Sequence, residues 1–231
     1  MEMELIHTML NYLKEDNMKQ EIKIEVPTKW SAVTLRQYLA LRKDLDTYAG
    51  EEEAITACLF HHLCKFPLEY IQQLNIDTYI AIREDLINFF NNIDMPLQKS
   101  ITIGGVQYGF EPDLSRMAYG AYVDISKYET FEINEKWAEI MSILYRPLIK
   151  TTGKLYDIKA YDGNIDGDKF MDVPMDIHFG TLFFLKTLLK DLLKDTQKSL
   201  TGLTGLPQNI KSVLERNGNL TQALSNSHKT I

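Results

Sequence analysis

Two adjacent glycines, Gly104 and Gly105, constrain the fold of this 231-residue chain more than any other feature. They lie in the middle of Ser100–Phe110, where apolar and polar residues alternate on both sides. Glycine readily adopts the positive φ angles that a two-residue hairpin turn requires, and alternation is typical of a half-buried strand. The segment therefore predicts an antiparallel β-hairpin. The expected cross-strand pairs are Ile103 with Val106, Ile101 with Tyr108, and Thr102 with Gln107.

Most of the remaining chain has the apolar spacing of three and four residues that is typical of amphipathic helices. The sequence Thr34-Leu-Arg-Gln37 is a capping box, which predicts the start of one of these helices. Strand-like sequence occurs at Glu21–Val26 and at Leu155–Ile158. We expect an α+β fold that is predominantly α-helical, with a small antiparallel β-hairpin or sheet. The predicted helices cover about residues 34–45, 51–66, 77–93, 115–128, 134–146 and 174–200.

The predicted helix over residues 77–93 has a wide apolar face. A face of this width requires cover from other parts of the chain, so we expect the helix to be largely buried. The residues expected on the buried face are Tyr79, Ile82, Leu86, Phe89, Phe90 and Ile93.

The pattern along the chain predicts three regions. Residues 1–20 are expected to form an N-terminal helical segment, because Leu5, Met9, Tyr12 and Leu13 share one side of a helix. Residues 21–200 are expected to form a single α-rich domain, and residues 201–231, rich in Gly, Ser, Asn and Thr, a flexible tail. The order of patterns in residues 21–67 resembles that in residues 101–147, which suggests an internal duplication.

The overall charge and composition exclude several classes of protein. The chain carries 25 basic and 32 acidic residues, a formal net charge of −7, which argues against nucleic acid as the main ligand. Two cysteines, Cys58 and Cys64, are too few for a disulfide framework and suit a reducing compartment. No signal peptide is visible, and charges interrupt the most apolar stretch, Met175–Leu193. We expect a soluble, cytoplasmic protein with no membrane partner.

One acidic loop contains the closest match to a metal-binding motif. Asp162, Asn164 and Asp166 match positions 1, 3 and 5 of a calcium loop, where oxygen ligands alternate before a sharp glycine turn. The position that requires a bidentate carboxylate is Val173, which cannot bind a cation. Because Asp, Asn and Gly also favour plain turns, a surface loop explains the same residues. We predict no metal site and retain these three residues as the only calcium candidate.

A second group of metal-type residues, Cys58, His61, His62 and Cys64, lies on one predicted helix. Four ligands cannot converge on zinc from one helix at this spacing, so a core helix explains them better. Sequence motifs for a nucleophile elbow, a phosphate-binding loop or a zinc protease are absent from the chain. We therefore predict a non-enzymatic protein with no catalytic residues and no cofactor.

Five stretches together resemble a group of small proteins of tailed bacteriophages, the tail assembly chaperones and neighbouring small structural proteins. Their order along the chain, together with the ending Leu144-Tyr-Arg-Pro147, carries the resemblance. It spans about residues 28 to 195. The stretches are Trp30–Leu39, Ile101–Tyr108, Met117–Asp124, Trp137–Pro147 and Tyr161–Gly163.

The resemblance implies an assembly protein that binds other virion proteins. A tail assembly chaperone of this kind keeps the long, helix-rich tape-measure protein soluble in the host cytoplasm while the tail is built, and the family has no catalytic residues. Two alternatives stay open. The protein could be a structural virion component, such as a ring or head–tail connector subunit that forms a homo-oligomer, or a metal-dependent enzyme that uses the Asp162–Asp172 loop.

Overall fold

The computed structural model describes residues 6–15, 18–91, 95–128, 130–152 and 155–201. The chain forms two compact units, Met1–Phe183 and Phe184–Ile231, which divide inside one long helix. The predicted single domain over residues 21–200 includes most of the first unit and the start of the second. The helix over residues 175–201 crosses the boundary between the two units. Residues 202–231 of the predicted tail lie outside the described residues.

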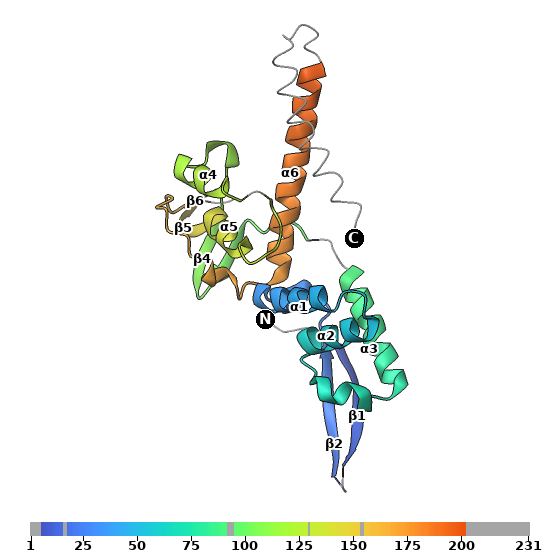
Figure 1. The fold of residues 1–231 in the computed structure, drawn as a ribbon. Helices are drawn as coiled ribbons and strands as arrows, with labels where there is room; N and C mark the ends of the chain where they lie inside the picture. The colour runs from blue at the N-terminus through green and yellow to red at the C-terminus, as the bar shows by residue number, and fades with distance from the viewer. Residues whose placement is uncertain (1–5, 16–17, 92–94, 129, 153–154, 202–231) are drawn as a thin grey trace. The chain divides into compact units, whose positions relative to one another are not determined.

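The fold is α+β and predominantly helical, as the sequence predicts (Figure 1). The α-helices are α1 (Leu35–Thr47), α2 (Glu52–Cys64), α3 (Ile76–Asn91), α4 (Tyr119–Ile125), α5 (Trp137–Leu144) and α6 (Met175–Thr201). The strands are β1 (Ile6–Glu15), β2 (Met18–Val26), β3 (Ser100–Ile103), β4 (Val106–Phe110), β5 (Tyr145–Thr152) and β6 (Leu155–Ile158). Short 3-10 turns are η1 (Trp30–Ala32), η2 (Leu68–Gln73), η3 (Leu114–Arg116) and η4 (Asp168–Phe170).

The predicted hairpin forms strands β3 and β4, and its register is confirmed. Ile101 pairs with Tyr108, and Ile103 pairs with Val106. Gly104 has a φ of 55° and its neighbour a φ of 80°, the left-handed values that the turn requires. The hairpin is one edge of a four-stranded antiparallel sheet of order β3-β4-β5-β6. The sequence predicted β3, β4 and β6, but not β5.

The predicted N-terminal helix over residues 1–20 is wrong. Residues Ile6–Glu15 form strand β1, which pairs antiparallel with β2. The apolar spacing of this segment fits a helix, but its partner strand supplies hydrogen bonds along nearly its whole length, and such pairing overrides a weak local preference. The two strands lie against α2 and α3 (Figure 1). The predicted strand at residues 21–26 is confirmed as part of β2.

The fifth helix ends earlier than the sequence predicts. Helix α5 stops at Leu144, and β5 begins at the next residue, so the helix does not reach Pro147. The residue before a proline is biased toward extended backbone, which favours a strand at Arg146. The carbonyl of Pro147 accepts a hydrogen bond from the Lys159 amide. The predicted helix over residues 115–128 is likewise shorter and is divided into η3 and α4.

The capping box at the start of α1 is confirmed. The Thr34 side chain accepts a hydrogen bond from the Gln37 amide at 3.3 Å, and the Gln37 side chain accepts one from the Thr34 amide at 2.9 Å. Together they satisfy two amides at the helix start. Helix α1 therefore begins where the local sequence predicts.

An aromatic cluster around Trp30 forms one part of the core. The Trp30 ring lies 4.3 Å from the ring of Phe89 in α3 and 4.9 Å from that of Phe179 in α6, measured between ring centroids. Tyr38 of α1 contacts both Trp30 and Phe179 edge-on. Aromatic pairs in these tilted arrangements stabilise a core beyond the area they bury. The cluster therefore joins α1, α3 and the first turns of α6.

The predicted duplication stays a prediction. Residues 6–64 and residues 100–144 each contain a hairpin, a 3-10 turn and two helices in that order. The hairpins differ in their surroundings, since β1 and β2 form a separate two-stranded sheet, whereas β4 pairs with β5.

Gly180 in α6 is a close-packing position. A Cβ atom at Gly180 would lie 2.6 Å from the carbonyl oxygen of Pro96, a backbone atom that cannot move aside cheaply. We expect Gly180→Ala to lower the free energy of unfolding by about 1–3 kcal/mol, although alanine favours helix. Gly120→Ala in α4 is the matched control, because its nearest atoms, in the Tyr161 ring, lie at 3.4 Å. Urea denaturation should show Gly120→Ala neutral or stabilising; equal losses for both would contradict the packing argument.

Candidate functional site

The carboxylates of the acidic loop, which contains the calcium candidate, already have partners close by in the sequence. Asp162 accepts a hydrogen bond from Lys159 at 2.8 Å and one from the Asn164 amide at 3.1 Å. The Lys159 ammonium and these hydrogen bonds lower the pKa of Asp162. Asp166 pairs with Lys169 at 2.8 Å. Across the described ranges, no three His, Cys, Asp or Glu side chains gather closely enough to hold a metal ion.

The cysteines and histidines of α2 have different surroundings. Cys58 and Cys64 are both buried, and burial raises the pKa of both thiols, that of Cys64 to about 12. A protonated, buried thiol is neither a metal ligand nor a nucleophile. His62 Nε2 lies 2.7 Å from Asp44 Oδ2, and His61 Nδ1 lies 3.3 Å from the carbonyl oxygen of Phe66. The structure does not bring the four residues together.

A buried polar pair joins α5 to α6. Trp137 and His178 are fully buried, and the indole Nε1 donates a hydrogen bond to His178 Nδ1 at 3.1 Å. Because an indole nitrogen can only donate, Nδ1 is the acceptor and the ring proton of neutral His178 sits on Nε2. Burial lowers the pKa of His178 to about 4, although the backbone carbonyls of Val173 and Phe170 oppose the shift. The histidine is therefore a neutral core residue.

Two further polar contacts hold the sheet and α6 in place. The Tyr145 hydroxyl donates a hydrogen bond to the carbonyl oxygen of Gln98 at 2.7 Å and lies 3.1 Å from Thr181 Oγ1. Arg146 forms a nearly buried ion pair with Glu111. A buried pair of this kind is costly to break, because each partner would be left as an unpaired charge. Both contacts pair polar groups in the interior, although Arg146 Nε is buried without a hydrogen-bond partner among the described residues.

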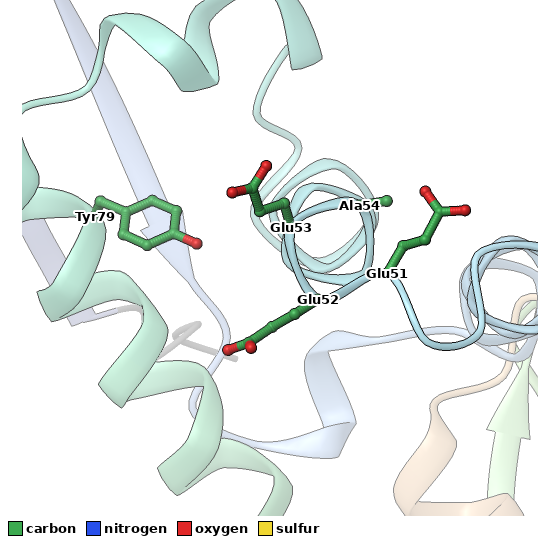
Figure 2. Close-up of a pocket in the computed structure, with 5 residues that line it drawn as sticks. All are labelled: Glu51, Glu52, Glu53, Ala54 and Tyr79. Carbon is green, nitrogen blue, oxygen red and sulfur yellow. The ribbon is translucent and has the colours of Figure 1, made fainter.

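One hollow in the first unit is acidic. It has a volume of about 650 Å³ and lies between the first turn of α2 and the side of α3. We call it the acidic pocket, and its lining residues are Glu51, Glu52, Glu53, Ala54 and Tyr79. Figure 2 shows Glu52 and Glu53 pointing from α2 toward Tyr79, whereas Glu51 points away. The Tyr79 ring itself packs on Phe60 of α2, with 5.5 Å between centroids.

An ion pair fixes the first turn of α2 against α3. The Arg83 guanidinium binds the Glu52 carboxylate, although both side chains are largely exposed. Glu52 and Glu53 lie in the first turn of α2, where the helix dipole favours negative charge. The ionisable groups of the acidic pocket are three glutamate carboxylates and the Tyr79 phenol. Its carboxylates attract cations.

The outer face of α3 carries a row of exposed isoleucines. Ile76, Ile80 and Ile87 are 66%, 45% and 52% exposed. At about 100° per residue, their positions fall within about 40° of one another around the helix. We call these three residues the isoleucine stripe. Arg83 lies on the same side of the helix between Ile80 and Ile87. Exposed isoleucines that share one side of a helix are typical of a surface that binds another protein.

The isoleucine stripe corrects the prediction that this helix is largely buried. Its predicted inner face is confirmed at three positions, since Ile82, Leu86 and Phe89 are at most 2% exposed. The opposite face carries the three exposed isoleucines together with Arg83. A signal for the stripe was present in the sequence, because isoleucines at positions 76, 80 and 87 recur at helical spacing on the side away from the expected core.

A second, smaller hollow of about 490 Å³ lies beside α1 and residues 133–135. Arg42 lines it and already donates a hydrogen bond to the carbonyl oxygen of Ile133 at 3.1 Å. Its other charged residues have both signs, so it has no clear preference for an ionic ligand. The lining residues are Leu39, Arg42, Lys43, Asp46, Thr47, Ile133, Asn134 and Glu135.

Comparisons with known proteins identify no relative of this chain. A scan against protein-family models, a search of curated proteins and a search of solved structures each find no match. Among the residues that the structure describes, no helix has both the length and the apolar composition that a membrane crossing requires. The acidic pocket and the isoleucine stripe are therefore the features from which a function is inferred.

Proposed function

We propose that this chain is a non-enzymatic assembly protein that binds helical segments of other proteins, and that it acts as a tail assembly chaperone for the tape-measure protein of a tailed bacteriophage. The single observation that carries the binding role is the isoleucine stripe on α3. The resemblance of Trp30–Leu39, Trp137–Pro147 and the stretches between them to phage tail assembly proteins supports the identity of the client.

The physical chemistry of the surface fits a chaperone. Exposed isoleucines gain free energy when a client covers them, at about 25 cal/mol for each Å² of apolar surface buried. A formal net charge of −7 keeps loaded complexes apart in the host cytoplasm. A row of only three apolar side chains gives weak contacts, and weak contacts allow the client to leave as the tail grows.

Coexpression with the tape-measure protein tests this proposal. We expect the full-length chain to keep the tape-measure protein soluble and to co-purify with it. Purified virions should lack the chain. Its presence in virions as a stable oligomer would instead identify a ring or connector subunit, and a calcium-dependent rise in melting temperature with turnover of a substrate would favour the metal-dependent enzyme.

A further inference from the structure

We propose that the acidic pocket and the isoleucine stripe form one docking surface for a basic amphipathic helix of another polypeptide. This inference rests on the proposed function and names the chemistry of the bound segment. Tyr79 lines the pocket and Ile80, the next residue, belongs to the stripe. Arg83 lies one turn later and pairs with Glu52 across the gap to α2. Pocket and stripe are therefore adjacent parts of one surface.

The charges around the stripe select a cationic partner. The N-cap and first turn of α2 and the outer side of α3 together carry five carboxylates and one guanidinium, and that guanidinium already binds Glu52. Nucleic acid and anionic lipid would be repelled by this surface. Lysines or arginines beside an apolar row would bind it. The five carboxylates belong to Glu51, Glu52, Glu53, Asp77 and Glu84.

The geometry of the stripe sets the form of the partner. Ile76 and Ile87 lie about 16 Å apart along the helix axis, at about 1.5 Å per residue. A partner helix of about 11 to 14 residues, apolar at every third or fourth position, covers this length. A second copy of this chain fits poorly, because a two-fold contact through the stripe would bring two acidic rims together.

A peptide-binding measurement tests the inference with the full-length protein. The probe is a fluorescein-labelled helix of about 14 residues built from leucine and lysine, and its counterpart carries glutamate at every lysine. We expect binding of the lysine peptide alone. Ile80→Ser/Ile87→Ser should weaken it by about tenfold or more. Glu53→Gln/Glu84→Gln should weaken it by about three- to tenfold at low salt and reduce its salt dependence.

Matched control variants distinguish binding at this surface from non-specific binding of the peptide. Ile149→Ser/Leu155→Ser removes apolar residues that are 69% and 77% exposed on β5 and β6, and it should leave binding unchanged. A second control, Glu132→Gln/Asp157→Asn, removes two exposed carboxylates elsewhere in the first unit and should also have no effect. Circular dichroism should show every variant to be folded, because each change is at the surface.

The outcomes distinguish this inference from the proposed function. Equal weakening by the control variants, equal binding of the glutamate peptide, or dimerisation through the isoleucine stripe would overturn the inference. If the tape-measure protein still co-purifies with Ile80→Ser/Ile87→Ser, the chaperone role stands and the docking surface is wrong. If the lysine peptide binds as expected but the tape-measure protein does not co-purify, the docking surface stands and the chaperone role fails.

Discussion

Trp137→Ala is expected to lower the free energy of unfolding by about 3–5 kcal/mol, the largest effect of any single change considered. Trp137 is fully buried in α5, so alanine leaves a large cavity. It also removes the donor that satisfies His178 Nδ1. Urea denaturation followed by far-UV circular dichroism measures the loss.

Two companion variants separate the causes of this loss. Trp137→Phe keeps most of the apolar volume but removes the indole donor, so we expect a smaller loss of about 1–3 kcal/mol. Tyr119→Ala removes an exposed ring from α4 and should change stability by no more than about 0.5 kcal/mol. A loss below about 1 kcal/mol for Trp137→Ala would show that this side chain is not buried in solution.

Stability is expected to fall between pH 6.5 and pH 4 because of one buried histidine. The pKa of His178 is about 4 in the folded chain, against an ordinary value of 6.5. Between these values the unfolded chain binds a proton that the folded chain does not, so the free energy of unfolding decreases as the pH falls. The shift corresponds to a loss of about 3 kcal/mol, complete near pH 4.

The variant His178→Asn isolates this effect. The asparagine side-chain oxygen can occupy the position of His178 Nδ1 and accept the hydrogen bond from Trp137. Unlike histidine, asparagine does not titrate. We expect a lower stability at pH 7 and a flatter dependence on pH above 4. The carboxyl groups of Asp113, Asp124, Asp162 and Asp172 have lowered pKa values, so their contribution is lost only below about pH 3.8. An unchanged pH profile in His178→Asn would contradict the assignment.

Local chemistry accounts for the parts of the fold that the sequence predicts. The two glycines at 104 and 105 require a tight turn whatever surrounds them, and the alternation beside them then determines the register. The capping box at Thr34 likewise depends only on its own four residues. Strand β1 could not be predicted in this way, because its partner supplies the hydrogen bonds that exclude a helix.

Which apolar side of α3 is exposed depends on long-range packing that no local pattern contains. Helix α3 is apolar on both sides, and only its packing against the rest of the first unit decides that Ile82 is buried and Ile80 exposed. The bond between Trp137 and His178 joins residues 41 positions apart, and the pair of Glu111 and Arg146 joins residues 35 apart. The expectation that the loop at Asp162, Asn164 and Asp166 holds no calcium stays a prediction; two of its carboxylates pair with lysines three residues away.

The order of the four-stranded sheet has a consequence for the speed at which the chain folds. Strands β3 and β4, and strands β5 and β6, are neighbours in sequence, so each pair can close early as a hairpin. We expect the hydrogen bonds between β4 and β5 to form later, because α4 and α5 lie in the connection between these strands. Closing that long connection costs more chain entropy than either turn. We therefore expect docking of the two hairpins, which forms the β4–β5 ladder, to be slower than closure of either hairpin.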